Sequence, residues 1–197
     1  MRKIIASEMI SIDGFFAGED GNIDWHTVDD DFNKFAVEFE KTVDTILFGR
    51  KTYQMFESYW PTALKDPATG AEDIEIAKFI EDAKKVVLSK TLDKLTWNNS
   101  VLIKDNIKEE IEKLKNEDGN LPAGASAKAR DIVIYGSGSV VAELTNLGLI
   151  DEYLFIISPT ILGKGVSLFK DISEKISLKL IETRKFENGN VMVIYKK

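Results

Sequence analysis

The sequence predicts an α/β fold in which a mostly parallel sheet carries helices on both faces and ends in an antiparallel edge. Short apolar blocks with strand character alternate along the chain with blocks whose apolar residues recur at helical spacing. This alternation is typical of a parallel sheet covered by helices. Near the C-terminus, Asn188-Gly189 stands between two segments of strand character, which indicates a closing β-hairpin.

The first half of the chain contains clear examples of both patterns. Residues 3–12 are rich in β-branched side chains and stop at the turn dipeptide Asp13-Gly14, so we expect a strand. Residues 29–41 begin with acids and then place phenylalanines at helical spacing, which predicts a helix. The same reasoning predicts a loop at 15–25, a strand at 42–48, a helix at 50–58, a polar excursion from residue 60, a helix at 72–83 and a strand at 85–88.

The second half continues the alternation. Residues 118–128 are rich in glycine, alanine and polar side chains, and we expect them to form the most mobile loop. The other elements expected here are a strand at 101–104, a helix at 106–116, a strand at 132–135, a turn at 136–139, a helix at 140–147 ended by Gly148, a strand at 151–158, a loop at 159–166 and hairpin strands at 177–186 and 191–195.

Composition excludes several classes of function. The 197 residues suit one domain, 1–197, and 44% apolar residues suffice for a sizeable core. A net charge of -7 disfavours nucleic acid and anionic membranes as partners. The absence of cysteine excludes disulfides and thiolate metal sites, and a single histidine, His26, leaves little for a metal site or a His-based triad. With no secretory signal and no spanning segment in the sequence, we expect a cytoplasmic protein that binds no metal.

The turn after the strand at 42–48 is the first candidate site. Ligands of open α/β sheets bind outside the carboxyl ends of the strands. Gly49 permits a tight turn there, and Arg50, Lys51 and Thr52 begin the next helix. Two cations at a helix N-terminus oppose the helix dipole, so a bound anion would explain them. The alternative is that both are ordinary solvated surface charges.

Two further turns follow buried strands. Ser89 and Lys90 could hold a phosphate or a ribose, although they equally suit a simple strand end. The run Gly136-Ser137-Gly138-Ser139 joins a buried strand to a helix and could cradle a pyrophosphate through its backbone N–H groups. The third glycine of a full dinucleotide-binding fingerprint is missing, because Val141 stands in its place. A tight turn without a ligand is the alternative.

The acidic stretch at 24–32 is the candidate for catalysis. A carboxylate at the start of a helix could anchor the N–H groups of a heterocycle or assist protonation. Acids are also favoured in the first turn of any helix, and Thr27 could be a plain N-cap. His26 alone fits a loop histidine better than a catalyst.

Taken together, these segments resemble the dihydrofolate reductase-like superfamily, in particular the reductase domain of the bifunctional riboflavin-biosynthesis deaminase-reductase and its stand-alone bacterial relatives. The motifs that carry the resemblance span nearly the whole chain. They are Ser11-Ile12-Asp13-Gly14, Phe48-Gly49-Arg50-Lys51-Thr52-Tyr53, Val87-Leu88-Ser89-Lys90, Ile134-Tyr135-Gly136-Ser137-Gly138-Ser139 and Pro159-Thr160-Ile161-Leu162-Gly163-Lys164-Gly165.

The resemblance implies a three-layer sandwich fold, NADPH as cofactor, a small heterocyclic substrate and a homodimer. It assigns the cofactor phosphates to Gly49, Arg50, Lys51 and Thr52, with Arg50 on the 2′-phosphate, and the adenosine half to Ser89 and Lys90. It assigns the pyrophosphate to Gly136, Ser137, Gly138 and Ser139; a Cβ at Gly138 would then block the pyrophosphate. Asp31, with Asp30 close behind, would bind the substrate.

The chain departs from this family in ways that concern the substrate. Val140-Val141 stands where dihydrofolate reductases often carry a tyrosine, which argues against folate. The riboflavin relative reduces a pyrimidine that carries ribose phosphate, and Lys164 is a weak candidate for binding that phosphate. A catalytically inactive NADP-binding module, acting as a sensor or scaffold, is the second hypothesis. A Rossmann-type NAD enzyme is the third.

Overall fold

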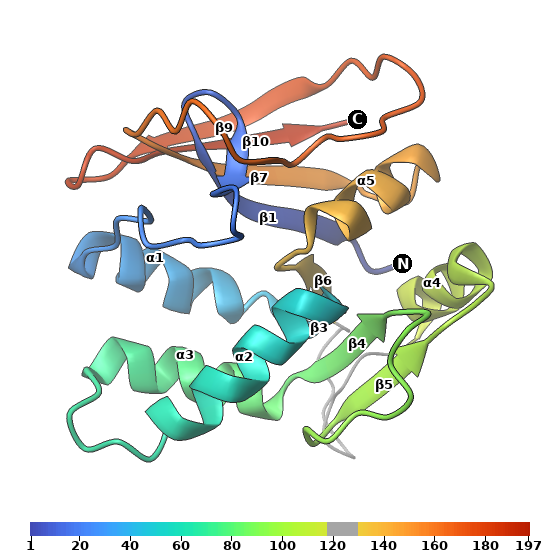
Figure 1. Cartoon of the computed structure of the whole chain (residues 1–197), viewed down its shortest axis with the longest axis horizontal. Coiled ribbons are helices and arrows are strands. Elements are labelled where there is room, and N and C mark those ends of the chain that lie inside the picture. Colours follow the sequence, from blue (N-terminus) through green and yellow to red (C-terminus); the bar gives the residue numbers. More distant parts are fainter. Residues whose placement is uncertain (118–129) are drawn as a thin grey trace.

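The computed structural model describes residues 1–117 and 130–197, and its centre is an eight-stranded sheet that draws strands from both ends of the chain (Figure 1). The strand order is β5-β4-β3-β6-β1-β7-β10-β9, and a separate two-stranded sheet pairs β2 with β8. The strands are β1 Ile4–Ser11, β2 Phe15–Ala17, β3 Val43–Gly49, β4 Lys84–Leu88, β5 Ser100–Ile103, β6 Asp131–Ile134, β7 Glu152–Ser158, β8 Val166–Ser167, β9 Lys179–Lys185 and β10 Val191–Lys196.

The strand directions confirm the mainly parallel sheet with a C-terminal antiparallel hairpin. Strand β1 pairs in parallel with both β6 and β7, and β3 pairs in parallel with β4 and β6. Strand β10 runs antiparallel to β7 on one side and to β9 on the other. The carboxyl ends of β1, β3, β4 and β6 therefore meet at one edge of the sheet, where ligands of such folds bind.

Helices cover both faces of this sheet. On one face, Ile111 of α4 and Leu144 of α5 pack into a core cluster with Leu47 and Ile134 of the central strands. On the other face, α1, α2 and α3 lie together, and Tyr53 and Ile80 belong to the cluster there. The helices are α1 Asp30–Glu40, α2 Arg50–Ala63, α3 Ala71–Asp82, α4 Ile107–Asn116 and α5 Gly138–Asn146. In the described ranges, none of them is long and apolar enough to cross a bilayer.

The structure differs from the sequence prediction in a few segments. Helix α2 continues through Pro61 to Ala63, although the sequence predicts its end at residue 58. Proline so close to a helix C-terminus interrupts little of the helix, and the extension buries Ala63 and packs Trp60 against Phe56. The predicted loops at 15–25 and 159–166 each contribute a short strand, β2 and β8, which pair with each other. The loop expected at 118–128 lies outside the described residues.

Asp13 joins the two loops that leave β1 and β7 at the site edge. The Ser11 hydroxyl donates to its carboxylate at 2.7 Å, and the backbone N–H groups of Leu162 and Gly163 donate at 3.1 and 2.7 Å. These hydrogen bonds, the one from Ser11 first, lower the pKa of Asp13. Two motifs that lie far apart in the sequence are thus one structural unit.

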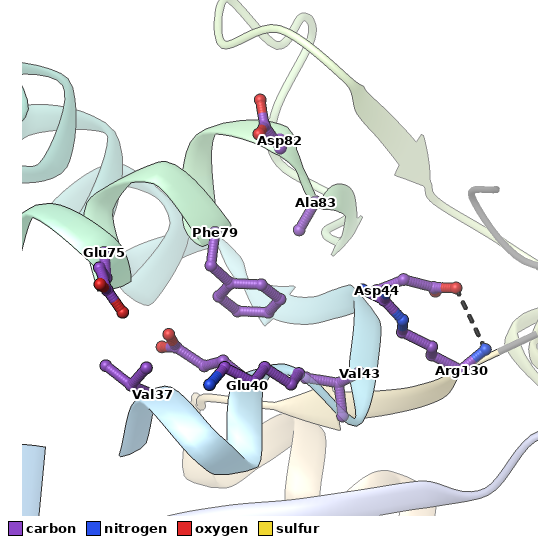
Figure 2. A pocket seen from close by; sticks show the side chains of 10 residues that line it. Val37, Glu40, Val43, Asp44, Glu75, Phe79, Asp82, Ala83 and Arg130 are labelled. Carbon is purple, nitrogen blue, oxygen red and sulfur yellow. Dashed lines mark hydrogen bonds between the residues drawn. The ribbon is translucent and has the colours of Figure 1, made fainter. Parts of the chain in front are cut away.

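Glu40 is a buried carboxyl group at the C-terminal end of α1. It is 6% exposed and lines a pocket of about 300 Å³ together with Glu75, Phe79 and Arg130, as Figure 2 shows. Burial raises the pKa of Glu40 to about 8. Glu40 lies at the C-terminal end of α1, where the helix dipole opposes a negative charge. The last turn of α1 contains no basic residue that would offset this effect.

We expect Glu40→Gln to remove a pH dependence of folding stability. The pKa of Glu40 is about 8 in the folded chain against an ordinary value of 4.5, so between these values the folded state holds a proton that the unfolded chain has lost. Stability should therefore fall as the pH rises from about 5 to about 9. In urea titrations at about pH 9, the variant should be more stable than the wild type by about 2–4 kcal/mol, with a smaller difference at about pH 5. Glu112→Gln, at an exposed position of α4, serves as control. An unchanged pH dependence in Glu40→Gln would contradict the assignment.

Candidate functional site

The turns after β3 and β6 lie in direct contact at the carboxyl edge of the sheet. The backbone N–H of Gly49 donates to the carbonyl oxygen of Gly136 at 2.9 Å. A Cβ placed on Gly49 would lie 2.3 Å from the Ser137 Oγ and 3.2 Å from the Ser137 backbone nitrogen, so only glycine fits. Because β3 and β6 are neighbouring parallel strands, their following turns have to meet. Two segments that the sequence proposes separately are therefore one site.

The helices that begin at these turns leave their first N–H groups without a side-chain cap. Gly49 is the N-cap of α2 and Ser137 is the N-cap of α5, and neither accepts a capping hydrogen bond through a side chain. In contrast, the Asp29 carboxylate caps α1 by accepting the N–H of Phe32 at 2.8 Å. The first turns of α2 and α5 also contain no acid. Two adjacent helix N-termini of this kind can bind the oxygens of a pyrophosphate.

The predicted cofactor-binding residues of the first turn surround this point. Arg50 and Lys51 are exposed on the first turn of α2, and Thr52 is half-buried. Gly136 has a φ of +100°, and a Cβ there would lie 3.0 Å from the Thr52 hydroxyl. Thr52 therefore lies against the second turn, while Arg50 and Lys51 are free to reach an anion bound at the helix N-termini.

The second turn is packed against β2. A Cβ on Gly138 would lie 2.8 Å from the ring of Phe16, so the nearest obstacle is this aromatic ring of the chain itself. Gly138 is thus also needed for packing, and the expectation that a Cβ there would block a pyrophosphate stays a prediction. The hydroxyl groups of Ser137 and Ser139 lie 2.8 Å apart at the entrance to α5.

Ser89 and Lys90 lie at the same edge, one strand further out. Gly49 pairs with Leu88 across β3 and β4, so Ser89 follows directly beside the first turn. The Ser89 hydroxyl accepts the N–H groups of Thr91 and Leu92 at 3.2 Å each, which closes the strand end. Lys90 is exposed. The serine thus has a structural role, and its position remains compatible with an adenosine nearby.

A cavity of about 670 Å³ opens beside the two turns, between the sheet and helices α1, α2 and α3. Thr52 and Tyr135 line it, so it reaches the turns themselves. Aromatic rings from α1 and α2 form much of the wall: Phe32, Phe35, Phe39, Phe56, Tyr59 and Trp60. Its polar side chains include Glu8, His26, Asn33, Glu40, Thr52 and Asp73. This combination of size, apolar wall and few polar groups is typical of a small-molecule site.

Glu8 is a buried acid at the junction of the cavity and the second turn. The pairing of β1 with β6 ends at Ala6 and Ile134, so Glu8 lies where β6 has already turned away at Gly136. Its Oε2 would be 3.8 Å from a Cβ on Gly136. Glu8 is 7% exposed, and its Oε1 has no hydrogen-bond partner in the described part of the chain. Burial raises the pKa of Glu8 well above its ordinary value and so favours the protonated carboxyl group.

His26 places a second isolated polar atom in the cavity wall. Its Nε2 is buried and finds no partner among the described residues, and its ring contacts Trp25 edge-on at 4.4 Å between centroids. Burial lowers the pKa of His26 to about 4, so the imidazole is neutral near pH 7. The sequence alone indicated an ordinary loop histidine, because nothing in its neighbourhood shows that the loop folds over the cavity.

The two acids predicted for catalysis, Asp30 and Asp31, lie in the first turn of α1 and outside the cavity lining. The Asp31 carboxylate accepts a hydrogen bond from the Arg184 guanidinium at 2.6 Å, which ties α1 to β9. Asp30 is exposed, and neither residue is among those that line the cavity. Their catalytic role therefore stays a prediction, and Glu8 is the carboxyl group nearest the second turn. The sequence signal for Glu8 was a single acid inside an apolar strand.

Comparison with known proteins agrees with this architecture. The model of the RibD C-terminal domain family matches residues 2–192. The protein YyaP of Bacillus subtilis, described as uncharacterized, is 37% identical over 194 residues, covering 98% of this chain and 94% of its own.

Solved structures share the fold. A putative riboflavin biosynthesis protein from Shewanella sp. PV-4 superposes with a TM-score of 0.70 at 20% identity, with 98% of each chain covered. The dihydrofolate reductase of Enterococcus faecalis, solved in complex with NADP(H), superposes with a TM-score of 0.58 at 17% identity, covering 98% of this chain and 95% of that one. With this dihydrofolate reductase-like fold and a family match over nearly its whole length, the chain belongs to the RibD C-terminal domain family.

Proposed function

We propose that residues 1–197 form one NADPH-dependent reductase domain that transfers a hydride to a small heterocycle of the pyrimidine or pteridine type. One observation carries the proposal: two helix N-termini without side-chain caps meet at Gly49 and Gly136, directly beside a deep aromatic cavity with a buried carboxyl group. Membership of a reductase family supports it. An NADP(H) complex of one structural neighbour supports the choice of cofactor.

The residues at the carboxyl edge fit a dinucleotide phosphate. The N–H groups at the starts of α2 and α5 would hold the pyrophosphate, together with the hydroxyl groups of Ser137 and Ser139. Arg50 would pair with the 2′-phosphate, with Lys51 beside it. Ser89 and Lys90 would lie along the adenosine half. When bound, NADPH would supply a hydride from its nicotinamide ring.

The cavity provides the environment for the second reactant. Its aromatic wall would exclude water and orient a flat ring against the turn at Gly136. Glu8 lies at this junction and its raised pKa favours the protonated form, so it can donate a hydrogen bond or a proton to a ring nitrogen or carbonyl that receives a hydride. In this proposal Glu8 takes the role that the sequence assigned to Asp31 and Asp30.

We further propose a cytoplasmic homodimer. Strand β9 is the outermost strand of the sheet, and its Leu180 and Ile181 are 50% and 48% exposed. Exposed apolar side chains on an outer strand favour contact with a second chain, and the charges of the same strand would confine that contact to its apolar part. The alternative of an inactive NADP-binding module remains, because such a module would use the same phosphate site. It would bind NADPH and oxidise none of it with any heterocycle offered.

We expect Arg50→Ala to weaken NADPH binding about tenfold or more and NADH binding less than about threefold, because only NADPH carries the 2′-phosphate. Calorimetric titration of both cofactors measures the two dissociation constants. Lys108→Ala is a matched control, since Lys108 is an exposed cation on the first turn of α4. Equal losses for the two cofactors would remove Arg50 from the 2′-phosphate site. A preference for NADH would favour an NAD enzyme of the Rossmann type.

We expect Gly49→Ala to weaken NADPH binding about tenfold, because the new Cβ would push Ser137 and the start of α5 away from α2. Gly70→Ala is the matched control: Gly70 is also an N-cap without a capping bond, and its Cβ would meet nothing closer than 3.9 Å. Adding Ser137→Gly to Gly49→Ala removes the obstructing side chain and should bring the affinity back toward that of Ser137→Gly alone, which lacks only the Ser137 hydroxyl. Circular dichroism monitors folding, and unchanged affinity in folded Gly49→Ala would contradict the joint site.

We expect Glu8→Gln to lower kcat about a hundredfold or more while leaving the NADPH dissociation constant near its original value, because the amide has the same shape and no acidic proton. The wild-type rate should fall as the pH rises through the elevated pKa of Glu8, and the variant should lack this decline. Asp31→Asn, assayed in parallel, decides between the two carboxyl groups. A larger kcat loss in Asp31→Asn than in Glu8→Gln would return the role to Asp31.

A further inference from the structure

The charges around the cavity restrict what it can accept. None of the described residues that line it is lysine or arginine. Its ionisable side chains other than tyrosine are Glu8, Glu40, Asp73 and His26. Burial keeps the His26 imidazole neutral, so it adds no positive charge. An anion inside the cavity would find no cation in its wall and would face three carboxyl groups.

A phosphate group is therefore a poor occupant. A phosphate dianion loses its hydration on entering such a cavity, and no charged hydrogen bond would compensate for the loss. The nearby carboxyl groups would either repel it or have to stay protonated. The cations predicted for phosphate, Arg50 and Lys51, belong to the separate site at the start of α2 and are not part of the cavity wall.

The wall suits a flat, weakly polar ring. The rings of Phe56 and Tyr135 lie stacked with 6.0 Å between centroids, and the Trp60 ring lies tilted 6.0 Å from that of Phe56. All three line the cavity. Aromatic faces arranged in this way bind a planar ring through offset stacking or edge contacts. A volume of about 670 Å³ is ample for a fused heterocycle.

Two buried polar atoms without partners, one on Glu8 and one on His26, indicate where a bound ring would need hydrogen-bonding groups. Glu8 and His26 both line the same cavity, and the Oε1 of Glu8 and the Nε2 of His26 are buried beside it without a partner among the described residues. A buried polar atom without a partner costs free energy that a ligand can recover by bonding to it. The amino groups, ring nitrogens and carbonyls of an aminopyrimidine or pterin supply the donors and acceptors that these two atoms lack.

We propose that the cavity selects an unphosphorylated amino-heterocycle, anchored by Glu8 and His26, and discriminates against the same ring carrying a phosphate. The inference rests on the proposed reductase function and makes its substrate class specific. It also separates this chain from a reductase of phosphoribosyl pyrimidines, since no lysine or arginine stands among the described lining residues to pair with the phosphate.

The test compares one aminopyrimidine in two forms, with and without a ribose 5-phosphate substituent. Binding is measured by quenching of tryptophan fluorescence, with Trp60 in the cavity wall, and turnover by NADPH oxidation. We expect the unphosphorylated form to bind at least about tenfold more tightly and to have the higher kcat/KM. Ser58→Lys places a cation on an exposed residue of the cavity lining and should shift the binding ratio toward the phosphorylated form, whereas Ser58→Gln should not.

The binding ratio decides this inference, and the turnover decides the proposed function. Equal or tighter binding of the phosphorylated form, or no binding of either form, would overturn the substrate class. Selective binding of the unphosphorylated form without any NADPH oxidation would support the substrate class and count against the reductase. Normal turnover of the phosphorylated form alone would support the reductase and refute the proposed selectivity.

Discussion

The contact between the turn after β3 and the turn after β6 is the constraint on which the candidate site depends. Gly49 donates a backbone hydrogen bond to Gly136, and no side chain fits between Gly49 and Ser137. This contact sets two uncapped helix N-termini side by side, and their partial positive charges add at one place. It also brings Thr52 of α2 against Gly136, so the same contact links the proposed phosphate site to the cavity.

Buried polar groups without partners are the second feature that sets the site apart from the core. Among the described residues, five buried side-chain polar atoms lack a partner, and two of them, the Oε1 of Glu8 and the Nε2 of His26, belong to residues that line this one cavity. A core gains nothing from such atoms, because each loses its hydration without a compensating bond. Their presence in one cavity is understandable if a ligand completes them.

Other acids of the chain have structural roles. Asp13 holds the loops after β1 and β7 together, and Asp31 ties α1 to Arg184 of β9. The Arg184 guanidinium also lies 4.8 Å from the ring centroid of Phe186, so the pair rests on the aromatic cluster beneath α1. These contacts fasten the loops after β1 and β7 to each other and α1 to the C-terminal hairpin. The contact of Asp31 with Arg184 is a structural role for an acid at the start of a helix, and the catalytic role of Asp31 stays a prediction.

The sequence by itself determined the alternation of strands and helices, the closing hairpin at Asn188-Gly189 and the turns at Gly49 and Gly136, because these follow from local periodicity and from backbone freedom at glycine. It did not identify Glu8 or His26 as residues of the site, since no local sequence pattern distinguishes either of them from an ordinary polar residue. Tertiary structure decided their importance through burial: the end of β6 exposes Glu8 to the cavity, and the loop before α1 folds His26 over it. Desolvation depends on which distant segments cover a side chain, and no local pattern records that.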